Sequence, residues 1–332
     1  MIRSYHWRAR LYGTLILVAF SVTAGNAQAA WKPTEKVEIV VSCKPGCGPD
    51  RIARLIQKIW KTHDLVPGTT TVLNKAGGGG GIQLSYIESH KGNGHVLGVG
   101  SSSALATYLT GRTKVGLLDM TPLALLVTEY IVTAVKGDSP IKDAKDLFAR
   151  LKKDPQSLAL GTATSRGGPN HQAVALAALR AGIDPAKMKV VVFQSGRIGR
   201  TNLLGGHIDF AQSSAGGFIN HHKQGKLRIL AVSAPSRLGG ALKNIPTWKE
   251  LGYDVDFGSF RSIMGPPGLS REQITYWENV FAKTVKTKEF QKSLVKRQMK
   301  ETFKKHDPLM TFLMQQDKQM REVLGALNIL RR

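Results

Sequence analysis

The stretch VEIVVSCKPGCGPDRIARLIQKIW, residues 37–60, decides the fold that this sequence predicts. Its β-branched run Val37–Val41 has the length and composition of a strand that is buried on both faces. The segment Lys44–Pro49 contains two glycines and two prolines, which favour a sharp turn with little side-chain bulk. Asp50 is the predicted N-cap of a helix, because apolar side chains recur after it at helical spacing. The stretch therefore predicts a strand, a tight loop and an amphipathic helix.

A loop in this position directs backbone N–H groups at whatever lies beyond the carboxyl end of the strand. These N–H groups, together with the helix dipole, favour a bound anion. The alternative is a plain connection between a strand and a helix, without a ligand. The residues of this stretch leave both interpretations open.

The same arrangement is predicted twice more in the first part of the chain. The strand-like run Thr70–Leu73 is followed by Asn74–Ile82, which contains five consecutive glycines. Such a run is costly to order in a simple connection, because glycine loses the most backbone entropy on folding. A third strand, His95–Val99, leads into the small polar segment Gly100–Ala104. Three strands that end in bare or hydroxyl-lined loops predict one shared crevice at their carboxyl ends.

The rest of the chain continues the alternation of strands and helices. A polar loop is predicted at Thr162–His171, a helix from about Gln172 to Ala181, and a largely helical region from Ser270 onward. Further strands are predicted at Pro122–Val127, Tyr130–Lys136, Leu158–Gly161, Val190–Phe193, a run ending at Ser213-Ser214, Leu227–Val232 and Val255–Phe257. This pattern predicts an α/β protein with parallel or mixed sheets covered by helices.

The first thirty residues have the features of a secretory signal peptide, with a predicted cleavage site near Ala30. Three arginines precede an apolar stretch from Leu11 to about Ala24, which is too short for a good membrane span. No later stretch is long and apolar enough to span a bilayer. We therefore predict an exported protein, and an apolar fraction of 42% is ample for a sizeable core.

The chain is strongly basic, with 47 Lys and Arg against 23 Asp and Glu and a formal net charge of +24. Removal of the three arginines of the signal peptide would leave +21. Such a charge attracts anions, whether nucleic acid, anionic lipid or small carboxylates. The basic residues are spread along the chain rather than gathered in a dense block, and an exported protein seldom meets DNA. We expect no nucleic-acid partner, and an exported polyanion-binding protein is an alternative interpretation.

The two cysteines, Cys43 and Cys47, flank a Pro-Gly turn. In an oxidising compartment such a turn can bring the two Cα atoms within roughly 6 Å, so both a disulfide and a free pair are possible. Two ligands four residues apart, without a nearby His cluster, fall short of a metal site. Motifs of serine hydrolases, zinc proteases and phosphate-binding loops are absent from the sequence. We therefore predict neither a metal nor a cofactor nor an enzyme, and a secreted hydrolase is the least favoured alternative.

Several segments together resemble one protein family. They are Cys43–Leu55, Asn74–Ile82, Leu203–Asp209, Gly225–Val232 with Ser236-Arg237, Ile245–Gly252 and Pro266–Gly268. Each motif is weak by itself, but their order and spacing together are a strong signal. Along essentially its whole mature length, the chain resembles the extracytoplasmic solute receptors of tripartite tricarboxylate transporters, the Bug proteins.

This resemblance implies a type II periplasmic binding protein, with two α/β lobes around a ligand cleft and a helical C-terminal region. Residues 31–127 and 234–332 would form the first lobe and residues 128–233 the second, and the lobes would close on the ligand like a flytrap. The implied function is that of a periplasmic, monomeric receptor for a small organic anion, such as a di- or tricarboxylate, an acidic amino acid or an aromatic carboxylate. It would deliver this ligand to a membrane permease.

The resemblance and the strand ends indicate the same loops as the ligand site, where clustered donors suit a carboxylate. In the first lobe the predicted ligand-binding residues are Pro45, Gly46, Cys47, Asp50, Gly78, Gly79, Gly80, Gly81, Ser101, Ser102 and Ser103. In the second lobe they are Thr162, Thr164, Ser165, Gly168, His171, Gln194, Ser195, Gly196 and Ser213.

The sequence departs from the family's usual pattern at several of these positions. The family's first loop commonly has an aromatic residue where Cys43 stands and three glycines where Gly46-Cys47-Gly48 stand. In the second lobe, Arg197 and Arg200 stand where an apolar or small residue is usual. These departures concern the identity of the ligand more than the fold, and Arg197 has two open roles, at a second carboxylate or at the surface.

Overall fold

The computed structural model describes residues 31–163 and 165–332, so the predicted signal peptide and Thr164 lie outside the described residues. Its strands are β1 (Val37–Val41), β2 (Thr70–Asn74), β3 (Val96–Ser101), β4 (Thr121–Lys136), β5 (Ala159–Ala163), β6 (Lys189–Phe193), β7 (Phe210–Ser214), β8 (Leu227–Val232), β9 (Gly258–Gly265) and β10 (Lys300–Lys304). Its α-helices are α1 (Gly48–Thr62), α2 (Gly81–Glu88), α3 (Ser102–Leu109), α4 (Ala144–Lys153), α5 (Pro169–Arg180), α6 (Gly196–Leu204), α7 (Ala215–Lys223), α8 (Arg271–Val285), α9 (Lys288–Arg297) and α10 (His306–Ala326). Short 3₁₀-helices are η1 (Gly78–Gly80), η2 (Leu117–Asp119), η3 (Pro185–Lys187) and η4 (Gly240–Leu242). Within this part of the chain, no helix combines the length and the apolar character needed to cross a membrane.

Strand β1 is buried on both faces, as its β-branched sequence predicts. Val37, Ile39 and Val41 pack with α1 and α8 on one face, whereas Val40 packs with α2 and α3 on the other. Strand β1 pairs in parallel with both β2 and β3. The carboxyl ends of these three strands therefore lie at one edge of the sheet, and the loops that follow them meet there.

Helix α1 begins earlier than predicted. The prediction that Asp50 is the N-cap is wrong, because Cys47 occupies that position and Gly48 is the first helical residue. Pro49 fits the first turn, where its missing N–H would have no helical partner. Asp50 instead lies inside the first turn, where the helix dipole favours a negative charge.

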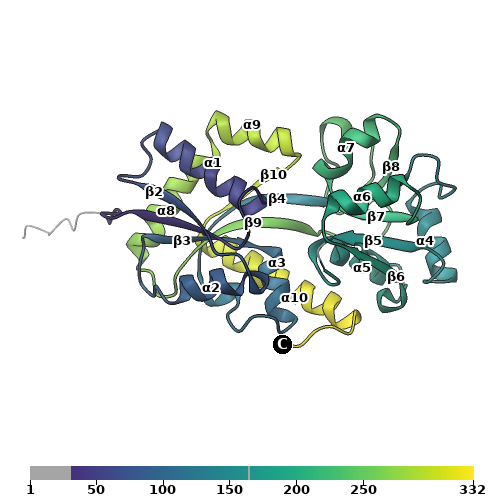
Figure 1. The fold of residues 1–332 in the computed structure, drawn as a ribbon, viewed down its shortest axis with the longest axis horizontal. Coiled ribbons are helices and arrows are strands. Elements are labelled where there is room, and N and C mark those ends of the chain that lie inside the picture. The colour runs from purple at the N-terminus through teal and green to yellow at the C-terminus, as the bar shows by residue number, and fades with distance from the viewer. Residues whose placement is uncertain (1–30, 164) are drawn as a thin grey trace, which may run out of the picture. The chain divides into compact units, whose positions relative to one another are not determined.

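Strand β4 joins two groups of strands (Figure 1). Its segment Thr121–Tyr130 pairs with β9 and, over part of that length, with β10, whereas Ile131–Lys136 pairs with β7 and β8. The sequence predicts two separate strands here, but the structure has one strand of 16 residues, because Thr128 and Glu129 continue the ladder with β9. The change of partners lies close to the predicted lobe boundary at residue 128, and the division into lobes stays a prediction.

The second group of strands has a parallel core in the order β6-β5-β7. The predicted strands Leu158–Gly161, Val190–Phe193 and Leu227–Val232 are confirmed to within two residues. Helix α5 starts at Pro169, three residues before its predicted start, because proline is well suited to the first position of a helix. The polar loop between β5 and α5 again follows the carboxyl end of a parallel strand.

The C-terminal region is less regular than predicted. The prediction of a strand at Val255–Phe257 is wrong: both side chains are buried, but the hydrogen-bonded strand β9 starts at Gly258. Strand β10 has no predicted counterpart and interrupts the helical region between α9 and α10. Its sequence, KETFK, has no strand pattern of its own, and its pairing with β4 is what makes it extended.

Helix α8 buries the face that carries Ile274, Trp277 and Phe281, as its spacing predicts. The ring of Trp277 stacks on that of Trp60 in α1, with a centroid separation of 5.4 Å. The indole N–H of Trp277 also donates to the carbonyl oxygen of Gly94 at 2.9 Å. This aromatic contact ties α8 to α1 and to the loop before β3, and so fixes the scaffold behind the strand ends.

Candidate functional site

The loops after β1, β2, β3 and β5 enclose a cavity of about 440 Å³, which we call the strand-end cavity. Its lining residues are Ser42, Cys43, Cys47, Pro49, Gly77, Gly79, Gly80, Ser101, Ser103, Ala106, Thr107, Thr110, Arg112, Ser165, Arg166, Gly167, Gly168, Pro169 and Arg261. Eight residues of the predicted site or disulfide are among them: Cys43, Cys47, Gly79, Gly80, Ser101, Ser103, Ser165 and Gly168. The structure therefore brings together loops that are up to about 120 residues apart in the sequence.

The first loop is held by Asp50 from behind the cavity. The sulfurs of Cys43 and Cys47 are paired as a disulfide, with their Cα atoms 6.4 Å apart. The buried carboxylate of Asp50 accepts hydrogen bonds from the backbone N–H of Gly46 at 2.8 Å, from Arg54 Nε and from Asn74 Nδ2. Burial raises the pKa of Asp50, but these hydrogen bonds outweigh burial and hold the pKa below its usual range. Asp50 thus organises the loop and does not line the cavity.

The second loop needs its glycines for two reasons. Gly77, Gly78, Gly79 and Gly80 all have positive φ angles, between 55° and 130°, which other residues rarely adopt. A Cβ atom on Gly79 would also lie 2.5 Å from Cγ2 of Thr107 in α3. The run of glycines therefore lets the backbone pass close to α3, and Gly77, Gly79 and Gly80 line the cavity without a side chain between them and a ligand.

The third loop turns its serines in different directions. Ser101 caps α3, since its hydroxyl accepts a hydrogen bond from the N–H of Ala104 at 3.4 Å, and Ser103 faces the cavity. Ser102 is buried and points away, with its hydroxyl donating to Ser259 Oγ at 3.2 Å. Only two of the three predicted serines therefore line the cavity.

The loop after β5 is fixed through Gly167. The N–H of Gly167 donates to Nδ1 of His171 at 2.9 Å, and the carbonyl oxygen of Gly167 accepts from Nε2 of Gln172 at 2.7 Å. His171 is completely buried, as is Thr162, so neither side chain lines the cavity. His171 acts instead as a positioning residue, because it holds the backbone that carries Ser165 and Gly168.

This role of His171 predicts a pH dependence of stability. Burial, together with the nearby charge of Arg166, lowers the pKa of His171 to about 4. An unfolded histidine protonates near pH 6.5, so the unfolded state binds more protons than the folded state between pH 6.5 and 4. The free energy of unfolding should therefore fall by roughly 2 kcal/mol between pH 7 and 5 through this group.

Urea unfolding at pH 7, 6 and 5 checks this expectation. His171→Gln should remove most of the fall in the free energy of unfolding between pH 7 and 5. His63→Gln, at an exposed position, should leave that fall in place. An unchanged pH slope in His171→Gln would show that the histidine is not buried as a neutral base.

Three arginines of the strand-end cavity were missed by sequence reasoning: Arg112, Arg166 and Arg261. Arg261 lies on β9, and its side chain is only 15% exposed. Its guanidinium donates to Ser259 Oγ at 2.8 Å and lies 3.9 Å from the carboxylate of Glu129. Burial lowers the pKa of Arg261, and Glu129 opposes that effect. In the sequence, the only indication of this role is that Arg261 is the single charged residue of the run GSFRSIMG. That indication can be used only when the run is recognised as a strand.

The other predicted residues lie outside the cavity lining. Pro45, Gly46, Gly78 and Gly81 belong to the right loops but do not line it, and Thr164 lies outside the described residues. Ser195 caps α6, with its hydroxyl accepting from the N–H of Ile198 at 3.4 Å. Gln194, Ser195, Gly196 and Ser213 form a separate group, in which Ser213 approaches Gly196. The structure therefore does not bring the loops after β6 and β7 to this cavity.

Arg197 and Arg200, where the sequence departs from the family's pattern, also lie outside the strand-end cavity. The side chain of Arg197 is exposed. Arg200 donates to the carbonyl oxygen of Gly217 at 2.8 Å and so ties α6 to α7.

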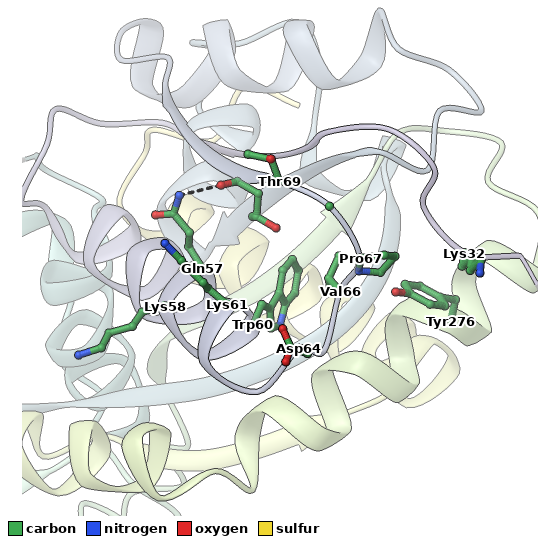
Figure 2. A pocket seen from close by; sticks show the side chains of 12 residues that line it. Lys32, Gln57, Lys58, Trp60, Lys61, Asp64, Val66, Pro67, Thr69 and Tyr276 are labelled. Atoms are coloured by element: carbon green, nitrogen blue, oxygen red, sulfur yellow. Dashed lines mark hydrogen bonds between the residues drawn. The ribbon is translucent and has the colours of Figure 1, made fainter.

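A larger hollow, of about 1030 Å³, lies elsewhere (Figure 2). It is formed by the last turns of α1, the segment before β2, and Tyr276 of α8. The amide of Gln57 there donates to the carbonyl oxygen of Thr70 at 2.8 Å, and a dashed line from Gln57 marks this hydrogen bond in Figure 2. This hollow lies at the amino end of β2, opposite to the edge where ligands bind in sheets of this type. It contains no predicted site residue.

No group of three or more His, Cys, Asp or Glu side chains is arranged to hold a metal ion within residues 31–163 and 165–332. The chemistry available at the strand-end cavity is that of N–H, hydroxyl and guanidinium donors.

Comparison with solved structures identifies the class to which this fold belongs. The fold matches that of solved periplasmic binding proteins. A TctC solute-binding protein from Polaromonas superposes with a TM-score of 0.78 at 22% identity, covering 88% of this chain and 99% of that one. A Rhodopseudomonas palustris protein solved with adipate gives a TM-score of 0.73 at 20% identity, covering 90% of this chain and 99% of its own.

Sequence comparison names the family. Residues 52–329 match the family described as "Tripartite tricarboxylate transporter family receptor". Protein BugT of Bordetella pertussis is 25% identical over 258 residues, which cover 76% of this chain and 77% of BugT. A relative from Cupriavidus necator is 22% identical over 331 residues and covers 98% of both chains. The chain belongs to the tripartite tricarboxylate transporter receptor family, and the family predicted from the sequence is confirmed.

Proposed function

We propose that this solute-binding receptor captures a small organic dicarboxylate in the strand-end cavity. The observation that carries the proposal is that Arg112, Arg166 and Arg261 all line one cavity of about 440 Å³. No Asp or Glu stands among the described residues that line it, so the positive charge there is uncompensated by the lining. Guanidinium groups bind carboxylates through paired, charge-assisted hydrogen bonds.

Two carboxylates fit this cavity better than one. The backbone amide of Gly79 and the hydroxyls of Ser101 and Ser103 can hold one carboxylate by neutral donors. The arginines then supply charge for a second one. Two solved Rhodopseudomonas palustris proteins with this fold carry malate and adipate, and both of these ligands are dicarboxylates.

The proposal includes closure of the two predicted lobes on the ligand. Arg112 and Arg261 belong to the predicted first lobe and Arg166 to the second, so one dicarboxylate can be bound from both. Strand β4 crosses the predicted lobe boundary at residue 128, and the segment between β8 and β9 crosses back near residue 233, so these two crossings are the natural hinge. The family and the predicted signal peptide support a periplasmic receptor that passes its ligand to a tripartite tricarboxylate transporter permease. The family is one of receptors and not of enzymes, so the ligand should leave unchanged.

A thermal-shift screen tests this proposal. The purified protein is heated with malate, adipate, citrate, aspartate or benzoate, at one fixed ionic strength, and with heparin as a polyanion. A ligand at about 100 times its dissociation constant stabilises the folded state by about 2.7 kcal/mol, which raises the unfolding midpoint measurably. We expect the dicarboxylates to give the largest shifts. Stabilisation by heparin alone would favour the polyanion-binding alternative and contradict the proposal.

A further inference from the structure

A second cavity, of about 330 Å³, shares only Arg261 with the strand-end cavity. It is lined by Gly48, Arg51, Ile52, Glu129, Ser214, Gly216, Gly217, Arg261, Lys296, Arg297 and Met299. These residues come from α1, β4, the junction of β7 and α7, β9, and the end of α9. We call it the rear cavity. Gly48 and Ser214 belong to loops that the sequence predicts to hold the ligand, and the other lining residues lie outside those loops.

The rear cavity holds an excess of positive charge. Arg51, Arg261, Lys296 and Arg297 line it, against the single carboxylate of Glu129. Glu129 lies 3.9 Å from Arg261, which is too long for a good hydrogen bond. Four cations around one carboxylate leave three positive charges without a partner in the lining. A recessed, electropositive space of this kind attracts anions.

Backbone groups add to this attraction. Helices α1 and α7 both begin at the rear cavity, and no side chain caps either of them. Their first turns carry Gly48, Gly216 and Gly217, whose amides no side chain of their own covers. A Cβ atom on Gly216 would lie 2.8 Å from the carbonyl oxygen of Arg297, so glycine is needed for α7 to approach the end of α9.

When no anion is bound, the positive charges repel one another, and the charged form of Arg297 is less favourable than in water. Burial lowers the pKa of Arg297, the charge of Arg51 lowers it further, and Glu129 opposes both effects. A lowered arginine pKa means that the charged form is less favourable there than in water. An anion bound among these side chains would remove that penalty.

We propose that the rear cavity is a second anion site, which binds a compact oxyanion of the phosphate type through Arg51, Lys296 and Arg297. A tetrahedral oxyanion offers several acceptor oxygens and up to two negative charges, which suits four cations and two helix amino ends. Such an ion would contact α1, α7 and α9 at once. Because Arg261 lines both cavities, the bound oxyanion would also influence the affinity of the strand-end cavity for its own ligand.

Isothermal titration of the purified protein with inorganic phosphate tests the proposal, at a constant ionic strength set with chloride. The double variant Lys296→Gln/Arg297→Gln removes two of the four cations and touches no residue of the strand-end cavity. The matched control is Lys288→Gln/Lys292→Gln, which removes two exposed charges from the same helix. We expect phosphate affinity to fall at least about tenfold in the first variant and less than about twofold in the control.

Two further measurements keep the result interpretable. Arg51→Gln changes a different helix, and it should also weaken phosphate binding. This variant gives an independent test in case the double variant Lys296→Gln/Arg297→Gln folds poorly. Glycerol phosphate serves as a second titrant, because its binding in place of phosphate would identify an ester as the source of the same oxyanion group. The proposal would be overturned if neither titrant bound to the wild-type protein, or if both double variants lost the same amount of phosphate affinity. Dicarboxylate binding in the strand-end cavity is measured in parallel, so failure of one site is distinguished from failure of the other.

Discussion

Replacement of Arg261 by glutamine should lower the affinity of the protein for its dicarboxylate by roughly 10- to 150-fold, the worth of one charge-assisted hydrogen bond. Arg261 lines the cavity from β9 and is largely buried, so its charge acts in a medium that screens it poorly. Ser259 Oγ and the carbonyl oxygen of Phe260 hold its Nη1, which fixes the guanidinium in place before the ligand arrives. Isothermal titration of the wild type and the variant measures the effect.

The control for this prediction is Arg271→Gln. Arg271 is 65% exposed on α8, and its salt bridge to Asp307 is long at 3.8 Å. Both variants lose one positive charge, so any general attraction of anions to this basic protein falls equally in the two. Equal losses of affinity would contradict a local role for Arg261. Arg261→Lys keeps the charge but cannot form a bidentate pair of hydrogen bonds. Its dicarboxylate affinity should lie between that of the wild type and that of the glutamine variant.

Replacement of Trp277 by alanine should lower the free energy of unfolding by about 3–5 kcal/mol. The side chain is fully buried, stacks on Trp60 and donates a hydrogen bond to the carbonyl oxygen of Gly94. The substitution leaves a cavity among α1, α8 and the sheet, and it leaves that carbonyl oxygen without its indole donor. Urea unfolding followed by circular dichroism measures the loss.

Tyr276→Ala is the matched control, since Tyr276 is the adjacent aromatic residue and is only partly buried. Tyr276→Ala should lower the free energy of unfolding clearly less than Trp277→Ala does. Trp277→Phe should recover part of the loss, because the ring fills most of the space but cannot donate the hydrogen bond. A loss below about 1 kcal/mol for Trp277→Ala would mean that the aromatic contact does not hold the scaffold together.

Much of the fold could be predicted because its strands carry their own signal. The run Val37–Val41 is mainly β-branched and Leu227–Val232 is apolar except for Arg228; both are largely buried, and the structure has strands with the same bounds. Strand β10 is different, since a charged pentapeptide becomes extended only by pairing with β4. Asp50 shows a similar limit: its residue type suits an N-cap, but Pro49 and Gly48 already fit the first turn.

The loops that form the candidate site could be predicted from the sequence, whereas the arginine side chains that line it could not. The glycine run and the serines were recognised because small residues at strand ends are a local pattern. The arginines were not, because a surface arginine and a cavity arginine look alike in a chain with 47 basic residues. Arg112 follows α3, Arg166 lies in the β5–α5 loop and Arg261 lies on β9, so only the tertiary fold brings them to one cavity.

We propose above that the strand-end cavity binds one small dicarboxylate reversibly, without changing it. The most direct test is an isothermal titration of the purified protein with the dicarboxylate that gives the largest thermal shift, followed by mass spectrometry of the recovered ligand. We predict one site per chain, a dissociation constant in the micromolar range, about −8 kcal/mol, and a ligand recovered intact. Absence of saturable binding for every dicarboxylate tested, or recovery of a converted product, would contradict the account.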